Sequence, residues 1–136
     1  MKNFTQAIVL ATTLTTIAIP SLAEVVIVVN SKNAAPQMSS EQASQYFLGK
    51  STSLTPIDQS EGSAIRGEFY KKLADKEASQ VKAIWSKLVF TGKGTLPKEV
   101  SSSDAVKKAI VADVNAIGYI EKSAVDSTVK EVATLP

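Results

Sequence analysis

The apolar residues of this chain form short continuous runs that alternate with segments of helical spacing. Residues 25–29 are an uninterrupted apolar and β-branched run, which is typical of a central strand covered by helices on both faces. Further strands are predicted at residues 55–58 and 117–120, and an edge strand at residues 129–132. The intervening helices are predicted at residues 39–48, 63–73, 79–88 and 103–115. Strands separated by helices indicate an α/β layer architecture.

Helix boundaries are marked by capping residues. Ser39 followed three residues later by Gln42 predicts a capping box, and Gly49 predicts the end of the same helix. Ser79 is the expected cap of the third helix, whose apolar residues share one face. The first helix and the third helix are therefore expected to pack against the sheet through one side only.

The first 23 residues have the pattern of a secretory signal peptide. Lys2 supplies a positive charge, residues 7–19 form an apolar segment, and small residues at positions 21 and 23 favour cleavage after Ala23. The alternative is an uncleaved membrane anchor, but the apolar segment is shorter than the ~20 residues that span a bilayer. We therefore expect a signal peptide at 1–23 and one exported domain at residues 24–136.

The amino-acid composition excludes several classes of function. The chain contains no cysteine and no histidine, which excludes thiol nucleophiles, Ser-His-Asp triads and the usual zinc sites. No cofactor motif is present, and we predict a protein that is not an enzyme. Without residues 1–23 the net charge falls from +2 to +1, because Lys2 is the one charged residue removed. A nearly neutral domain gives no electrostatic footprint for nucleic acid.

The junction between the predicted strand 55–58 and the helix that follows is the strongest candidate site. A turn of small, polar residues at a helix start leaves backbone N–H groups free to bind an anion. The candidate ligand-binding residues are Ser60, Gly62, Ser63, Ala64, Ile65 and Arg66. The alternative is purely structural: Ser60 caps the helix and Glu61 interacts with its dipole.

A second glycine-rich loop at residues 91–94 adds Lys93 to the candidates. Two glycines allow the backbone amides to turn inward as a small anion nest, and Lys93 adds positive charge. An ordinary glycine-containing loop explains the same residues equally well.

Five blocks of this sequence, in this order and spacing, resemble one half of the phosphate-binding proteins of ABC transporters. They are YFLGK at 46–50, EGSAIRGEF at 61–69, Trp85, FTGKG at 90–94 and AIGYI at 116–120. The resemblance implies a single lobe of the type II periplasmic-binding-protein fold, with a small mixed sheet flanked by about four helices. It also implies a periplasmic location, phosphate or a related oxyanion as ligand, and an ABC permease as partner.

The resemblance carries over to some residues and not to others. Ser63 matches the serine of the family's Gly-Ser-Gly-Thr signature and Arg66 matches an arginine that often follows it, whereas Gln59 replaces an arginine. Ala64 and Ile65 stand where the family has glycine and threonine. These differences favour an alternative function: a ligand-free interaction or structural module of the cell envelope. Because the family closes two lobes over its ligand, a homodimer of this shorter chain could rebuild the cleft.

Overall fold

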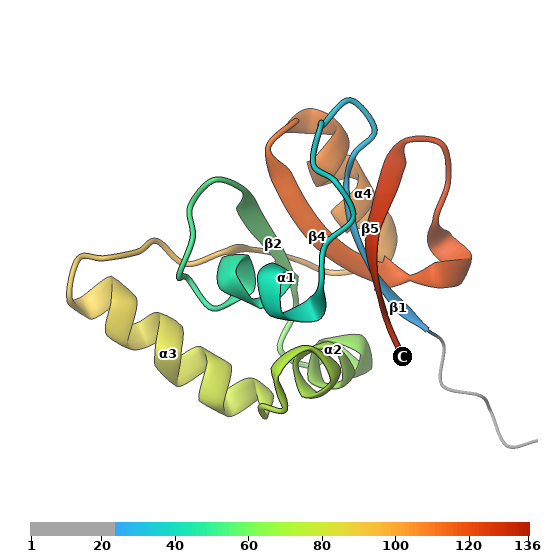
Figure 1. Cartoon of the computed structure of the whole chain (residues 1–136). Helices are drawn as coiled ribbons and strands as arrows, with labels where there is room; N and C mark the ends of the chain where they lie inside the picture. The colour runs from blue at the N-terminus through green and yellow to red at the C-terminus, as the bar shows by residue number, and fades with distance from the viewer. Residues whose placement is uncertain (1–23) are drawn as a thin grey trace, which may run out of the picture.

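The computed structural model describes residues 24–136, and the predicted signal peptide lies outside the described residues. Its centre is one sheet of five strands in the order β3-β2-β4-β1-β5 (Figure 1). The strands are β1 Val25–Asn30, β2 Thr55–Gln59, β3 Lys98–Val100, β4 Ala116–Glu121 and β5 Val129–Leu135. The α/β layer architecture is confirmed, as is the edge position of the last strand.

The sheet is mixed. β1 pairs antiparallel with β4 and with β5, whereas β2 pairs parallel with β4 and with β3. The carboxyl ends of β2, β3 and β4 therefore lie at the same edge of the sheet. At that edge Val25, the first residue of β1, lies opposite Glu121 of β4 and Leu135 of β5.

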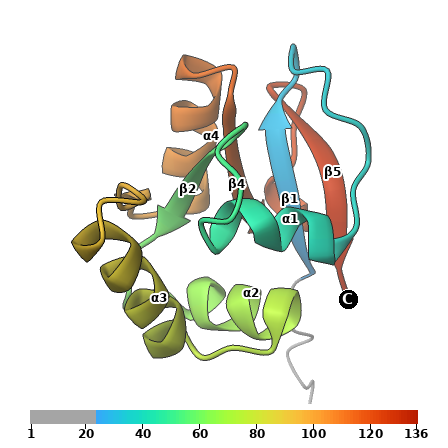
Figure 2. The ribbon, with the colours of Figure 1, turned by 60° about the vertical axis from the view of Figure 1, so that its left-hand side comes forward.

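Helices cover both faces of the sheet. They are α1 Ser40–Phe47, α2 Ala64–Ala74, α3 Ala78–Phe90 and α4 Ser103–Ala112, with a short 3-10 turn η1 at Lys122–Ala124. α1, α2 and α3 belong to the apolar cluster on one face, and α4 belongs to the cluster on the other face (Figure 2). In residues 24–136, no helix has the length and apolar composition that crossing a membrane requires.

The β1 strand confirms the prediction from its continuous apolar run. Val25, Ile27 and Val29 point into the cluster that contains α1 and α2. Val26 and Val28 point into the cluster that contains α4. All five side chains are fully buried, because both faces of this strand are covered.

Two sequence predictions about local structure need correction. The third helix begins at Ala78 rather than after Ser79, because the amide of Glu77 donates to Oε1 of Gln80 at 2.8 Å. The strand β3 was not predicted, because it has only three residues and no alternation of apolar and polar positions. Its residues are mostly exposed. By contrast, the capping box of Ser39 and Gln42 is confirmed.

Gly118 sets the distance between α4 and the sheet. A Cβ atom at this position would lie 2.6 Å from Cγ1 of Val106 and 3.2 Å from Cδ1 of Ile110. Valine is stiff at its single side-chain torsion, so the helix rather than the side chain would have to move. The absence of a side chain at Gly118 therefore brings α4, and with it the start of that helix, close to β4.

We expect Gly118→Ala to lower the free energy of unfolding by about 1–3 kcal/mol, because it overpacks the contact between α4 and β4. Urea unfolding at equilibrium measures this change. Gly67→Ala is the matched control, since no atom lies within 4 Å of the added Cβ; in the interior of α2 it should stabilise by about 0.5–1 kcal/mol. Equal stability of Gly118→Ala and the natural chain would contradict this account of the packing.

Candidate functional site

A groove of about 450 Å³ lies where the carboxyl ends of β2 and β4 meet the starts of α2 and α4. We call it the α2–α4 groove. One wall is the start of α2 and the other is the start of α4, with Gln59 and Glu121 contributed by the strand ends. The two helix starts contribute these residues to the lining: Ser63, Ala64, Ile65, Ser102, Ser103 and Asp104.

The start of α2 presents unpaired hydrogen-bond donors. Ser63 is the residue before the first turn, yet its side chain makes no capping hydrogen bond, and its buried Oγ has no partner among the described residues. The amides of Ala64 and Ile65 are in the first turn, where the helix supplies no carbonyl acceptor. Within residues 24–136 they also have no hydrogen-bond acceptor outside the helix. The amide of Ser63 is not available, because it donates to the carbonyl of Ser60 at 2.9 Å.

The start of α4 faces the same groove. Ser102 caps this helix, because its Oγ accepts from the amide of Ala105 at 3.1 Å. Ser103 lies one residue further, and its Oγ is 3.5 Å from Nε2 of Gln59 on the opposite wall. Two helix N-termini, each with a partial positive charge of about +0.5, thus face one groove.

Acidic side chains limit the positive potential of the groove. Asp104 and Glu121 both line it, and among the described residues none of those in its walls is a lysine or an arginine. Glu61 does not add to this charge at the start of α2, because it forms an ion pair with Lys82 at 2.8 Å. The hydrogen bond to Lys82 lowers the pKa of Glu61. The contact of Glu61 is thus with α3, whereas the sequence predicted an interaction with the dipole of α2.

Ser60 has a different role from both roles predicted for it. Its amide and its Oγ both donate to the carbonyl of Val100, at 3.0 and 3.2 Å. Ser60 therefore joins the end of β2 to the end of β3 and does not cap α2. Gly62 lies in the exposed turn that follows, outside the walls of the groove.

Arg66 is buried beneath the groove and is held by the protein itself. Its side chain is 5% exposed. Nη1 donates to the carbonyl of Gln59 at 3.0 Å and to Glu99 at 2.9 Å, and Nη2 lies 3.6 Å from Asp58. Burial opposes the charged form, but Glu99 and Asp58 raise the pKa of Arg66 above its usual value. The positive charge that the sequence offered as an anion partner is thus engaged by two carboxylates.

Asp58 is the centre of a buried polar network that the sequence did not single out. Tyr70 donates to its Oδ2 at 2.8 Å, and the hydroxyl of Tyr119 donates to its Oδ1. The amide of Gln59 donates to the same Oδ1 at 2.9 Å and to the hydroxyl of Tyr119 at 3.0 Å. Phe69 stacks on Tyr119 with ring centroids 3.8 Å apart, which closes the network to water.

Lys93 lies at another groove, so the structure does not bring it to the α2–α4 groove. Lys93 is near Thr55 at the start of β2, whereas Gln59 at the end of β2 lines the α2–α4 groove. Four residues of strand separate these two ends by about 13 Å.

The predicted anion nest at residues 91–94 is also absent. The amides of Gly92 and Lys93 donate to the carbonyls of Val89 and Leu88, and Gly92 has φ +71°. This arrangement is the end of a helix.

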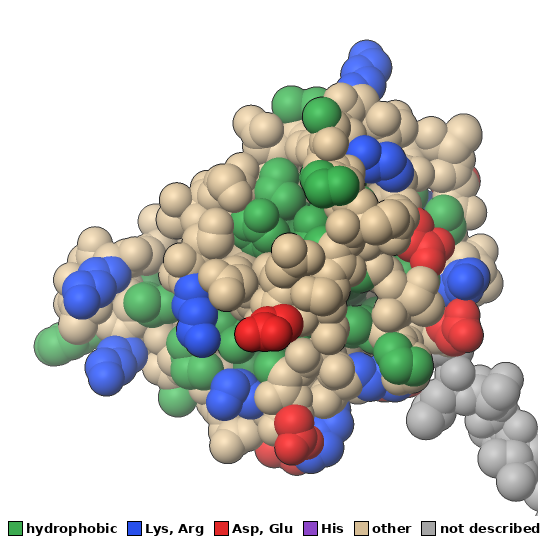
Figure 3. Space-filling view, in the orientation of Figure 1, with side chains coloured by type: hydrophobic (Ala, Val, Ile, Leu, Met, Phe, Trp, Pro, Cys, Tyr) green, Lys and Arg blue, Asp and Glu red, His purple; other side chains and the backbone are tan. Residues whose placement is uncertain are grey.

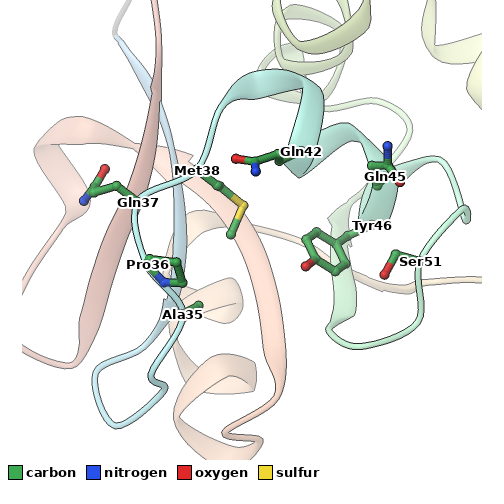
Figure 4. A pocket seen from close by; sticks show the side chains of 8 residues that line it. All are labelled: Ala35, Pro36, Gln37, Met38, Gln42, Gln45, Tyr46 and Ser51. Carbon is green, nitrogen blue, oxygen red and sulfur yellow. The ribbon is translucent and has the colours of Figure 1, made fainter.

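The groove beside α1 offers no charge to an anion. A groove of about 280 Å³ lies between residues 35–38 and α1, where Met38 and Tyr46 stand on opposite sides (Figure 4). None of the eight residues that line it is charged. Among residues 24–136, no group of three acidic, histidine or cysteine side chains is arranged to hold a metal ion.

The mixed sheet, with three helices on one face and one on the other, is the fold of one lobe of a periplasmic substrate-binding protein. Three solved structures share it. A protein described as a phosphate ABC transporter substrate-binding protein, with bound phosphate, from Clostridium perfringens has a TM-score of 0.66 and 20% identity, over 81% of this chain and 44% of its own.

Two further structures agree with the first. An ABC-type phosphate transport receptor from Vibrio cholerae has a TM-score of 0.62 and 18% identity, over 81% of this chain and 45% of its own. PstS from Borrelia burgdorferi has a TM-score of 0.56 and 10% identity, over 82% of this chain and 47% of its own. The chain thus spans less than half the length of these binding proteins. No protein-family model matches its sequence, and no curated protein matches it.

The buried tyrosines predict how stability depends on pH. Burial raises the pKa of Tyr70 and of Tyr119, and the charge of Asp58 raises both further. An unfolded tyrosine loses its proton near pH 10, whereas these two keep theirs, so the stability they provide is complete below pH 10 and is lost above it. Each contributes a slope of up to about −1.4 kcal/mol per pH unit to the free energy of unfolding.

We expect Tyr119→Phe to remove one of these two slopes above pH 10 and to leave the curve parallel to that of the natural chain between pH 7 and 9. Urea unfolding across this pH range measures both. Ion pairs of lysine that weaken in the same range are common to the two proteins and cancel in the difference. Parallel curves above pH 10 would mean that Tyr119 titrates in the folded chain.

Proposed function

We propose that this protein is an exported single-lobe domain that binds phosphate or a related oxyanion in the α2–α4 groove. The observation that carries the proposal is the meeting of two helix N-termini at one groove, where Ser63 Oγ is buried without a partner. Oriented backbone dipoles and unpaired N–H groups favour an anion there. The bound phosphate named for the similar structure from Clostridium perfringens supports phosphate as the first ligand to test.

The donors of such a site would be hydroxyl and main-chain groups. Ser63 would donate its hydroxyl, and Ala64 and Ile65 would donate their amides. The side chain of Ile65 does not interfere, because it packs against the apolar cluster under α2. Arg66 would act indirectly, by fixing the end of β2, where Gln59 lines the groove, against Glu99 on β3.

Binding of this kind is expected to be weak. Glu121 repels an anion in the groove, Asp104 is paired with Lys107 at 3.4 Å, and the charge of Arg66 is neutralised below the groove. Association itself costs at least ~4 kcal/mol, so a few hydrogen bonds correspond to a Kd near 1 mM or somewhat below. A second chain facing the groove, as a homodimer, or an ABC permease docked there would add the contacts that one lobe lacks.

One observation favours a second candidate function, a ligand-free interaction module of the cell envelope. The cation expected to meet the anion is engaged internally, and the groove carries two carboxylates instead. An apolar surface at the end of α3 is exposed in the same molecule. Titration with phosphate separates the two functions.

We expect phosphate at about 10 mM to shift the amide resonances of Ala64, Ile65 and Ser103 in the natural chain, with a Kd near 1 mM. Ser63→Ala should raise the Kd about tenfold, because it removes a hydrogen bond to a charged group worth about 1.5–3 kcal/mol. Heteronuclear NMR measures both. Ser79→Ala is the matched control: this serine is exposed near the start of another helix, α3, and its loss should leave the Kd unchanged.

A titration without localised shifts at these amides would remove the oxyanion proposal. Equal weakening by Ser63→Ala and Ser79→Ala would point to a general salt effect rather than to a site. Recovery of one envelope partner by the natural chain, in the presence and in the absence of phosphate, would support the interaction module instead.

The proposed export can be tested by identifying the N-terminal residue of the protein made in the cell. We expect mass spectrometry of the chain purified from the envelope fraction to find Glu24 as its first residue, because signal peptidase requires a small residue before the cleaved bond. Ala23→Arg should block this cleavage and leave the full-length chain, whereas Ala23→Ser should be processed normally. An intact N-terminus in the natural chain would contradict the predicted signal peptide.

A further inference from the structure

The end of α3 exposes an apolar surface that the oxyanion proposal does not use. Phe90, the last residue of the helix, is 92% exposed, and Leu96 in the following loop and Val89 are 61% and 42% exposed. We call these three residues the α3 tip. α3 and this loop project from the side of the sheet in Figure 1, and Figure 3 shows apolar side chains among lysines in the same region.

The sequence around the α3 tip is basic. Residues 78–98 contain Lys82, Lys87, Lys93 and Lys98 and no acidic residue. Lys82 pairs with Glu61, but Lys87, Lys93 and Lys98 form no ion pair within residues 24–136. Three lysines without an ion pair among the described residues therefore lie close in sequence to the exposed ring of Phe90.

Packing inside the domain does not explain the exposed ring. The inward face of α3 is complete without it, because Val81 and Trp85 are buried and Nε1 of Trp85 donates to the carbonyl of Phe47 at 2.9 Å. The helix ends just beyond Phe90 with the hydrogen bonds of Gly92 and Lys93, so the ring is presented on an ordered turn.

The positive charge near the α3 tip favours an anionic partner. A symmetric pairing of two α3 tips would bring like charges together, which disfavours a dimer through this surface. An anionic bilayer supplies what the tip lacks: lipid phosphates attract the lysines, and an aromatic ring enters the boundary between headgroups and acyl chains. Lysine side chains can lie along apolar surface while their ammonium groups stay at the headgroups.

We propose that the α3 tip binds the surface of an anionic lipid bilayer, with Phe90 and Leu96 inserted between headgroups and Lys87, Lys93 and Lys98 on the lipid phosphates. This interaction goes beyond the proposed oxyanion site and does not depend on it, since none of the three tip residues lines the α2–α4 groove. The tip would hold the domain at a membrane surface.

Sedimentation with vesicles tests the proposal. The natural chain, purified from the envelope of the expressing cell, should bind vesicles of phosphatidylcholine mixed with phosphatidylglycerol and leave pure phosphatidylcholine vesicles unbound. Binding should fall as salt rises from about 0.1 to about 1 M, because the Debye length shrinks from ~10 to ~3 Å. Phe90→Ala should lower the partition coefficient about tenfold, since it removes the largest inserted side chain.

Matched variants identify the tip as the binding surface. Val111→Ala removes another exposed apolar side chain, on α4, and should bind vesicles as the natural chain does. The double variant Lys87→Gln, Lys93→Gln should lose most of the dependence on phosphatidylglycerol. All variants are prepared with the same N-terminus, verified by mass spectrometry, and their circular dichroism and Tm are compared to confirm that they fold.

The proposal is overturned if Phe90→Ala and the natural chain bind vesicles equally, or if neither binds. It is also overturned if the natural chain ignores vesicles but forms a dimer that Phe90→Ala abolishes, as sedimentation velocity would report; the tip would then be a protein interface. Loss of phosphate binding by Ser63→Ala leaves these outcomes unchanged, so failure of the oxyanion proposal and failure of this one are distinguishable.

Discussion

A guanidinium group without access to water is the constraint on which the arrangement of this lobe depends. Removing the charge of Arg66 from solvent costs several kcal/mol, and only close carboxylates and a carbonyl offset that cost. Its partners come from different strands: Asp58 and the carbonyl of Gln59 on β2, and Glu99 on β3. Through Tyr119, which also donates to Asp58, the same network reaches β4. One buried cation of α2 thus positions the ends of three parallel strands.

This constraint also shapes the candidate site. Arg66 connects β3 to the end of β2, where Gln59 lines the α2–α4 groove, but it contributes little charge to the groove. What the groove offers an anion is the geometry of two helix starts and the hydroxyl of Ser63. A site with these donors is selective for shape and hydrogen bonding more than for charge, which is consistent with weak and exchangeable binding.

Much of the fold could be predicted from local sequence. The buried strand of residues 25–29 and the capping box at Ser39 depend on residues that are neighbours in the chain. The roles of Ser60 and Arg66 could not be predicted, because their partners Val100 and Glu99 lie on β3, a short exposed strand without an apolar signal. Residue types at a turn indicate which donors exist, whereas long-range pairing decides which of them remain free.

Enclosure decides how strongly an open groove of this kind can hold its ligand. Water competes for the same amides and hydroxyls and also screens their dipoles, so each hydrogen bond contributes less than it would in a closed cleft. The part of this chain that aligns with the similar binding proteins covers only 44–47% of their length. The affinity of the proposed oxyanion site would therefore depend on whatever surface covers the α2–α4 groove, because hydrogen bonds from Ser63 and its neighbours strengthen only when water is excluded.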